Sequence, residues 1–266
     1  METKRQPELT AMTGMAIVMV LFIHAGASCL GNCFPGMSYL QAGKLLHVFS
    51  LLVSPAVPMF IFLAGYKFAL RDKETSYPAW LRKRLPRVLM SFFIINTLFW
   101  LLDSIVWMDS FDPILLLKTY ISSWMGNTVA YPLWYIPMYC CVIVACPLVC
   151  RVIPNGMIRL ILYFLMGAVQ QTAAVTLPVL DGKPWMFVAY PLFFELGIWA
   201  CEKNWSEKLA GKYVVPAAVF GCYVMMTCAF PAVFSAEITA YLCDIVGVVA
   251  AYVICLGVKH RSKSVV

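Results

Sequence analysis

The chain has 266 residues, of which 62% are hydrophobic and 12% are charged, and its formal net charge is +7. Soluble globular domains carry about 25% charged residues. The composition therefore excludes an ordinary soluble domain and indicates an integral membrane protein. We assign the positive charge to membrane topology and expect no nucleic-acid partner.

Apolar segments recur along the whole chain. A bilayer core needs about 20 apolar helical residues, and the uniform hydrophobicity does not show the alternation of membrane β-strands. The sequence therefore predicts an all-α polytopic helical bundle, a single membrane-embedded domain over 1–266 with about eight transmembrane helices. The expected spans are 9–30, 46–70, 88–108, 131–152, 157–178, 184–201, 210–231 and 235–258.

The connections between these spans carry a strong charge bias. Seventeen of the twenty Lys and Arg residues lie on the same side of the predicted membrane as the N-terminus, and three lie on the other. Because basic residues are retained in cytosolic connections, this bias predicts a topology with both termini inside. The external connection near 109–130 contains 114–121, which we expect to lie at the membrane interface as an amphipathic helix.

Four ionisable side chains fall at membrane depth in the predicted spans: His24, Asp103, Glu195 and Asp244. His47 and Glu237 lie near the outer ends of their helices. Such residues are costly in lipid and are therefore functional candidates. An imidazole exchanges protons near neutral pH, so His24 is suited to deprotonate a hydroxyl, although a structural hydrogen bond to a neighbouring helix is an equal alternative. Glu195 lies mid-helix and is a candidate to orient His24. Asp103 and Asp244 lie near helix ends, where we expect them to reach headgroups or water.

A basic element precedes the third span in the cytosolic connection 71–87, with Arg82, Lys83, Arg84 and Arg87. Positive-inside anchoring alone explains such a cluster. However, Arg84 and Arg87 are three residues apart and share a face on a helix, where two guanidinium groups can bind phosphates.

The eleven cysteines do not form a metal-binding or disulfide framework. Most lie in apolar segments, where cysteine behaves as a small hydrophobic residue. Cys29 and Cys33 are the pair placed to reach the outer surface, and their spacing alone is weak evidence for a disulfide. We therefore expect no metal site.

With these pieces located, the sequence resembles the acyltransferase 3 family, multi-span membrane enzymes that O-acylate sugars and cell-surface glycans. Four elements carry the resemblance, and they occur in the same order. They are TGMAIVMVLFIH at 13–24, ending on the family's essential histidine; VPMFIFLAGY at 57–66; RKRLPR at 82–87; and LWYI at 133–136.

The resemblance implies that a cytosolic acyl-CoA, expected to be acetyl-CoA, donates its acyl group to a hydroxyl of a sugar or envelope polysaccharide. His24 would be the catalytic base, supported by Glu195. The donor would be held by Arg84 and Arg87 with Arg82 and Lys83, and by the matched positions Tyr66 and Thr13. Acyl-CoA would be a consumed co-substrate, with no permanently bound cofactor. The location implied is the cytoplasmic membrane, most plausibly bacterial.

Three departures from the family pattern leave other functions open. Thr13 stands where the family has an arginine, eleven residues before His24, and cannot supply a guanidinium. Ala64 replaces the usual serine before Gly65 and Tyr66. Family members typically have about ten spans, so we expect the last two helices to be lacking. The alternatives are a catalytically silent remnant or scaffold, and a small-solute transporter.

Overall fold

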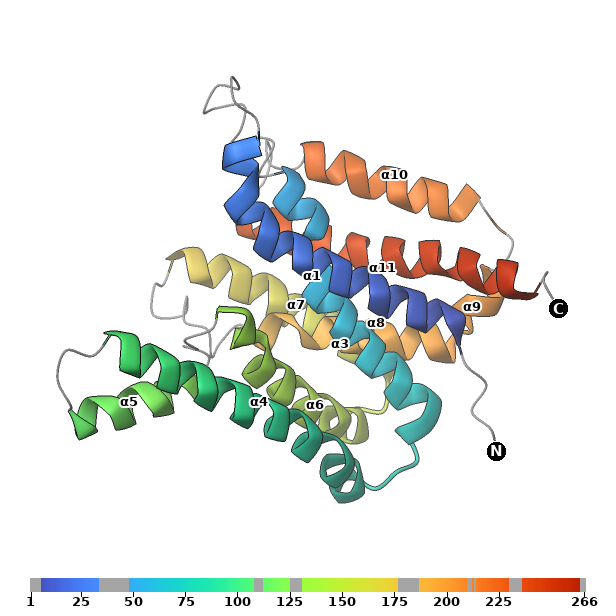
Figure 1. The fold of residues 1–266 in the computed structure, drawn as a ribbon. Coiled ribbons are helices and arrows are strands. Elements are labelled where there is room, and N and C mark those ends of the chain that lie inside the picture. Colours follow the sequence, from blue (N-terminus) through green and yellow to red (C-terminus); the bar gives the residue numbers. More distant parts are fainter. Residues whose placement is uncertain are drawn as a thin grey trace. The chain divides into compact units, whose positions relative to one another are not determined.

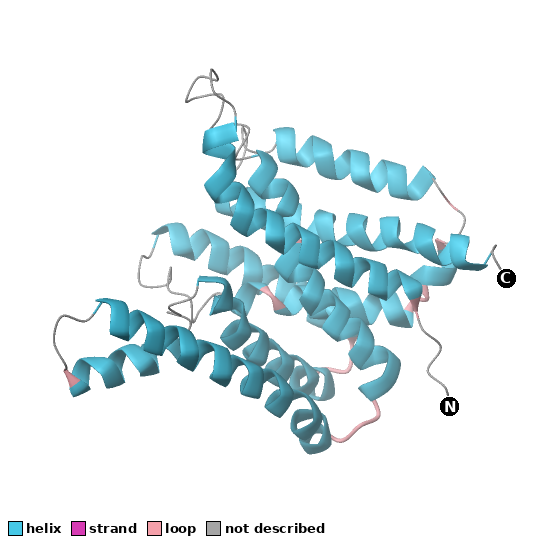
Figure 2. Cartoon of the chain, in the orientation of Figure 1, coloured by secondary structure: helices cyan, strands magenta, loops and turns pink. Residues whose placement is uncertain are grey.

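A computed structural model describes residues 6–33, 48–107, 112–124, 131–176, 187–209, 212, 214–229 and 236–263. Helices make up nearly all of these ranges, and they contain no strand (Figure 2). The predicted all-α class is confirmed for this part of the chain. Cys29 and Cys33 lie on a described helix, but their side chains, and therefore the question of a disulfide, are outside the described structure.

Five helical segments in the described ranges are long and apolar enough to cross a membrane. They are Pro7–Ala25, Val48–Asp72, Tyr77–Val106, Tyr135–Val152 and Glu237–Gly257. A helix also accompanies each of the other three predicted spans, but two of these are short: α8 (Pro191–Glu202) has 12 residues and α10 (Val214–Ala229) has 16. The total of eight spans and the inside location of both termini therefore stay predictions.

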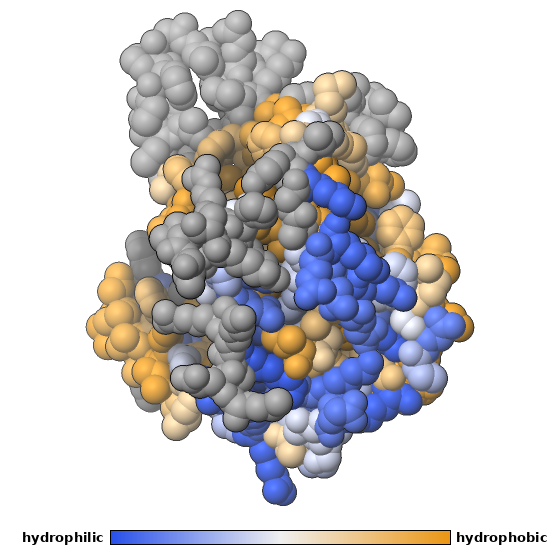
Figure 3. Space-filling view, turned by 90° about the vertical axis from the view of Figure 1, so that its right-hand side faces the viewer, coloured by the Kyte–Doolittle hydropathy of each residue, from blue (hydrophilic) through white to orange (hydrophobic). Residues whose placement is uncertain are grey.

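Many large apolar side chains point outward, which is the reverse of the arrangement in a soluble protein. Ile105 is 77% exposed and Ile114 is 68% exposed. Hydrophobic and hydrophilic residues occupy separate parts of the surface in Figure 3. Lipid covers such apolar surfaces without cost, since the helical backbone satisfies its own hydrogen bonds.

The contacts divide the chain into two compact units, 1–70 with 193–266 and 71–192. The first unit contains α1 (Pro7–Cys33), α3 (Ala56–Lys67), most of α8, α9 (Trp205–Lys208), α10 and α11 (Ala236–Lys263). α1 packs along α3 and α11, and α1 begins at the end of the unit where α11 finishes (Figure 1). An even number of spans requires this placement of the termini.

Two glycines allow α3 and α8 to cross with their backbones in contact. A Cβ atom on Gly65 would lie 1.9 Å from the carbonyl oxygen of Phe194, and one on Gly197 would lie 2.0 Å from that of Phe62. No side chain fits at either position. Small residues at close helix crossings are a common device of membrane proteins, because association there depends on close packing.

The second predicted span is interrupted at Pro55, between helical residues 48–53 and α3. Proline has no N–H, so the Leu51 carbonyl four residues earlier has no helical donor. The Tyr223 hydroxyl of α10 donates here, 2.7 Å from the Leu51 oxygen and 3.0 Å from that of Leu52, and the Ser54 hydroxyl also lies 3.0 Å from the Leu51 oxygen. Ser54 donates to the Asp244 carboxylate of α11. Asp244 is thus bonded to another helix at the interruption, and the expectation that it merely reaches headgroups or water was wrong.

The second unit is built on α4 (Tyr77–Trp107), whose 31 residues extend about 46 Å. The helix already contains the basic element, which we expected in a connection ending at residue 87. The other helices of the unit are α5 (Pro113–Trp124), the short 3₁₀ turn Tyr131–Trp134, α6 (Tyr135–Val152) and α7 (Gly156–Thr176).

α5 and α6 follow one another along α4 (Figure 1). α5 packs on the C-terminal half of α4, where Asn96 donates to Ser123 over 2.8 Å and the Trp100 indole donates to Thr119 over 3.0 Å. α6 packs near the beginning of α4. The segment predicted to be an interfacial helix therefore lies along a membrane helix, because polar pairs give it a partner that sequence periodicity does not reveal.

Candidate functional site

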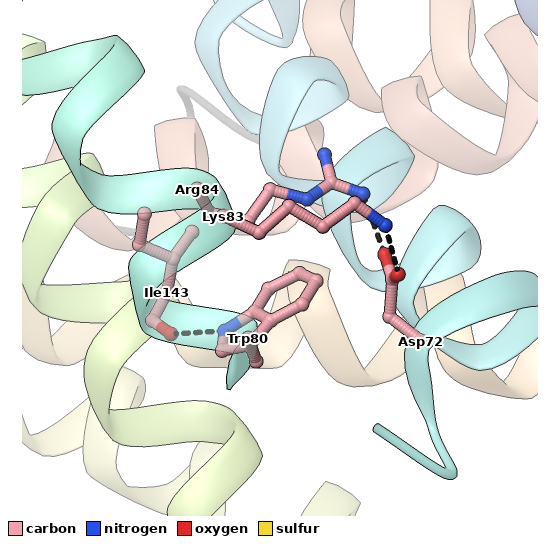
Figure 4. A network of polar contacts seen from close by, with 5 residues as sticks. All are labelled: Asp72, Trp80, Lys83, Arg84 and Ile143. Atoms are coloured by element: carbon pink, nitrogen blue, oxygen red, sulfur yellow. Dashed lines mark hydrogen bonds and ion pairs between the residues drawn. The ribbon is translucent and has the colours of Figure 1, made fainter. Parts of the chain in front are cut away.

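The basic element lies on the first turns of α4 and is joined to the end of the preceding helix. α3 continues into a π-helical turn, Phe68–Asp72, which ends on a carboxylate. Asp72 forms ion pairs with Lys83 at 2.9 Å and with Arg84 at 2.7 Å (Figure 4). The Asp72 side chain is only 2% exposed, so both cations compensate a buried negative charge.

Arg84 is held on a second side by an aromatic ring. Its guanidinium carbon lies 4.8 Å from the centre of the Trp80 ring, a cation–π distance. Trp80 is buried, and its indole N–H donates to the Ile143 carbonyl of α6 over 3.1 Å (Figure 4). The Nε atom of Arg84 is buried and has no hydrogen-bond partner among the described residues. The guanidinium is therefore oriented, and the Arg84 side chain remains 27% exposed.

The remaining cations of the element are open to solvent. Arg82 and Arg87 are exposed, and no ion pair joins either of them to a described residue. Asp72 offsets one of the positive charges of Lys83 and Arg84, so the element as a whole remains positive. Oriented guanidinium groups with excess positive charge are suited to bind phosphate.

His24 lies on α1 with its side chain exposed. Two residues earlier, Phe22 contacts Phe49 edge to face, with ring centres 6.1 Å apart. Thr13, at the other predicted position on this helix, is half-buried, and its hydroxyl donates to the Leu9 carbonyl over 2.8 Å. Thr13 thus uses its donor within α1 and presents no charge.

Glu195 is fully buried on α8, beside the crossing with α3. That crossing lies at Phe62, whereas α1 meets the second span near Phe49 at the level of Phe22. Residues 49 and 62 are 13 positions apart, or about 20 Å at 1.5 Å per residue. The orienting role of Glu195 toward His24 stays a prediction.

Tyr66 is buried in an aromatic cluster of the first unit. Its ring lies 5.9 Å from that of Tyr252 and 6.4 Å from that of Phe62. Glu8, at the start of α1, is fully buried and interacts electrostatically with Tyr66. Tyr66 therefore has a packing role in addition to its predicted contact with the donor.

Sequence reasoning missed two acidic residues that the structure places in electrostatic contacts, Glu8 and Asp72. Asp244 was a candidate, but its bond to Ser54 was not predicted. Asp72 was the easier of the two missed residues to find from the sequence, because it stands between two basic residues, Arg71 and Lys73. Its partners lie 11 and 12 residues away on the next helix, so the periodicity of a single helix does not reveal them. Within the described ranges, no group of three His, Cys, Asp or Glu side chains is arranged to hold a metal ion.

The fold and this site define a helical membrane protein with an oriented basic site next to its spans. A family model described as an acyltransferase domain matches residues 7–265. The chain therefore belongs to the acyltransferase 3 family, and the resemblance carried by the four sequence elements is confirmed. No curated protein and no solved structure matches the chain.

Membership of this family identifies the protein as a multi-pass membrane enzyme that transfers acyl groups. The matched range contains His24, Glu195 and the whole basic element.

Proposed function

We propose that the protein is an O-acyltransferase that moves an acyl group, expected to be acetyl, from cytosolic acyl-CoA to a hydroxyl of a sugar or cell-surface glycan. The observation that carries this proposal is Arg84, a guanidinium fixed by Asp72 and Trp80 in a chain of the acyltransferase family. The location we propose is a bacterial cytoplasmic membrane, with both termini inside.

The donor's phosphates provide the ligand for the basic element. Arg84 has an oriented guanidinium on a side chain that is 27% exposed, and Arg87 is exposed without an ion pair to the described residues. Arg82 and Lys83 add positive potential. Since Thr13 supplies no charge, the phosphate contacts are assigned to α4, and a role for Thr13 and Tyr66 is limited to uncharged parts of the donor.

His24 supplies the proton chemistry. The imidazole accepts the proton of the acceptor hydroxyl while the oxygen attacks the thioester carbonyl. The carbon–sulfur bond breaks, the proton passes to the departing thiolate, and the products are an O-acyl ester and free CoA. Acyl-CoA is a co-substrate consumed in each turnover, so no resident cofactor is required.

The test uses inside-out membrane vesicles supplied with radiolabelled acetyl-CoA and a panel of glycan and lipid-linked sugar acceptors. We expect wild type to transfer label, and His24→Ala to lose it by a factor of about 10² or more. Leu21→Ala, an exposed residue three positions earlier on α1, is the control for insertion and abundance. Full activity of His24→Ala would remove His24 from the mechanism.

A wild-type chain that inserts correctly but transfers nothing would contradict the proposal and favour a catalytically silent scaffold. Solute counterflow without CoA dependence would favour a transporter.

A further inference from the structure

A proline in α6 provides the attachment point for the basic element. Pro147 lies inside α6 and has no N–H, so the Ile143 carbonyl, four residues earlier, lacks its helical donor. A side chain from the start of α4 replaces it, and a second donates to the carbonyl beside it. The Trp80 indole donates to the Ile143 oxygen over 3.1 Å, and the Tyr77 hydroxyl donates to the next carbonyl, Val144, over 2.9 Å.

The indole that donates to the Ile143 carbonyl is also the ring against which the Arg84 guanidinium stacks. Trp80 and Arg84 are four residues apart and therefore lie on one face of α4. Trp80 is 1% exposed, so its ring has no free space in which to turn. The hydrogen bond to Ile143 fixes the plane of the indole, and the plane of the indole determines where the guanidinium stacks.

We propose that Trp80 is a positioning residue for Arg84, and that it acts through the Ile143 carbonyl that Pro147 leaves free. This inference rests on the proposed function, in which Arg84 binds the phosphates of acyl-CoA. Trp80 and Pro147 need no contact with the donor. They set the guanidinium between the indole and Asp72, so that less of its freedom is lost when a phosphate binds.

The first unit offers a matched control. At Pro55, the same loss of a helical donor is compensated by the Tyr223 hydroxyl at 2.7 Å from the Leu51 oxygen, with the Ser54 hydroxyl at 3.0 Å from it. No cation–π contact to Tyr223 occurs among the described residues. Tyr223→Phe thus removes the same kind of hydrogen bond without touching a cation.

The experiment measures KM for acetyl-CoA and for acetyl-pantetheine, which has the thioester arm but no phosphates. Trp80→Phe keeps a ring but loses the N–H, and Pro147→Ala returns the Ile143 carbonyl to its own helix. We expect each to raise KM for acetyl-CoA about three- to tenfold, from the size of a buried cation–π contact. KM for acetyl-pantetheine should not change, and Tyr223→Phe should change neither.

The double variant Trp80→Phe with Pro147→Ala is the decisive measurement. Both changes act on one hydrogen bond, which Trp80→Phe removes and Pro147→Ala weakens by competition for the same oxygen, so the KM of the double variant should equal that of Trp80→Phe alone. Additive effects, or equal effects on acetyl-pantetheine, would show general damage and overturn the inference. If Pro147→Ala does not accumulate in the membrane, Pro147→Leu restores the same N–H.

Arg84→Ala separates this inference from the proposed function. If Arg84→Ala raises KM for acetyl-CoA while Trp80→Phe and Pro147→Ala do not, the phosphate site stands and the positioning role is wrong. If Arg84→Ala leaves KM unchanged, the phosphate site itself is wrong and the inference is overturned with it.

Discussion

Asp72 and Arg84 form a 2.7 Å ion pair in which the Asp72 side chain is almost fully buried and the Arg84 side chain is 27% exposed. Lys83 contacts the other carboxylate oxygen but is 58% exposed. The two ion pairs of Asp72 therefore differ in their contribution to stability, since solvent screens an exposed pair far more than a buried one.

This difference predicts the ranking of two variants. Lys83→Gln should change the free energy of unfolding by less than about 1 kcal/mol. Asp72→Asn should cost about 2–4 kcal/mol, because it leaves Arg84 without its buried counter-ion. Thermal unfolding of the purified protein in detergent measures both. Equal losses for the two variants would mean that Asp72 does not distinguish its partners.

Arg87 should contribute to donor binding without contributing to stability. It is exposed and makes no ion pair with the described residues, so Arg87→Ala removes no interaction that holds the fold. We expect KM for acetyl-CoA to rise about tenfold, as for the loss of one charge-assisted phosphate contact. The effect should shrink at high salt. Arg82→Ala, which removes an exposed charge five residues earlier on α4, should produce a smaller change.

Thr13→Arg should strengthen donor binding by restoring the guanidinium that the family carries at this position. The wild-type hydroxyl is satisfied within α1, so its loss leaves no buried donor unpaired elsewhere. We expect KM for acetyl-CoA to fall by up to about tenfold. Gly14→Arg is the matched control, because it places the same charge one residue away on an open face. An equal fall in both variants would indicate a general charge effect.

Gly65→Ala and Gly197→Ala should each prevent α3 and α8 from crossing. The added methyl groups would lie 1.9 Å and 2.0 Å from a backbone oxygen, far inside van der Waals contact. A backbone atom cannot avoid this clash by changing a rotamer. We expect little or no folded protein in the membrane, measured by the yield of monodisperse protein after detergent extraction. Gly221→Ala, whose Cβ meets nothing within 4 Å, should accumulate like wild type.

Composition and local pattern were sufficient to predict much of this protein. Each of the eight predicted apolar segments contains a helix, because hydrophobicity and helix formation are properties of a continuous stretch of chain. The element at 82–87 was identified for the same reason, since its charges are adjacent. The order of four short motifs was enough to indicate the family that the match over 7–265 confirms.

Tertiary structure decided which residues act on one another. Asp72 with Arg84, Trp80 with the Ile143 carbonyl, and Tyr223 with the Leu51 carbonyl join residues 12, 63 and 172 positions apart. A proline within a helical sequence indicates that a carbonyl will lack its helical donor. It does not indicate which side chain will replace that donor. That choice depends on which helices pack together, and helix packing is set by contacts between distant segments that no local periodicity encodes.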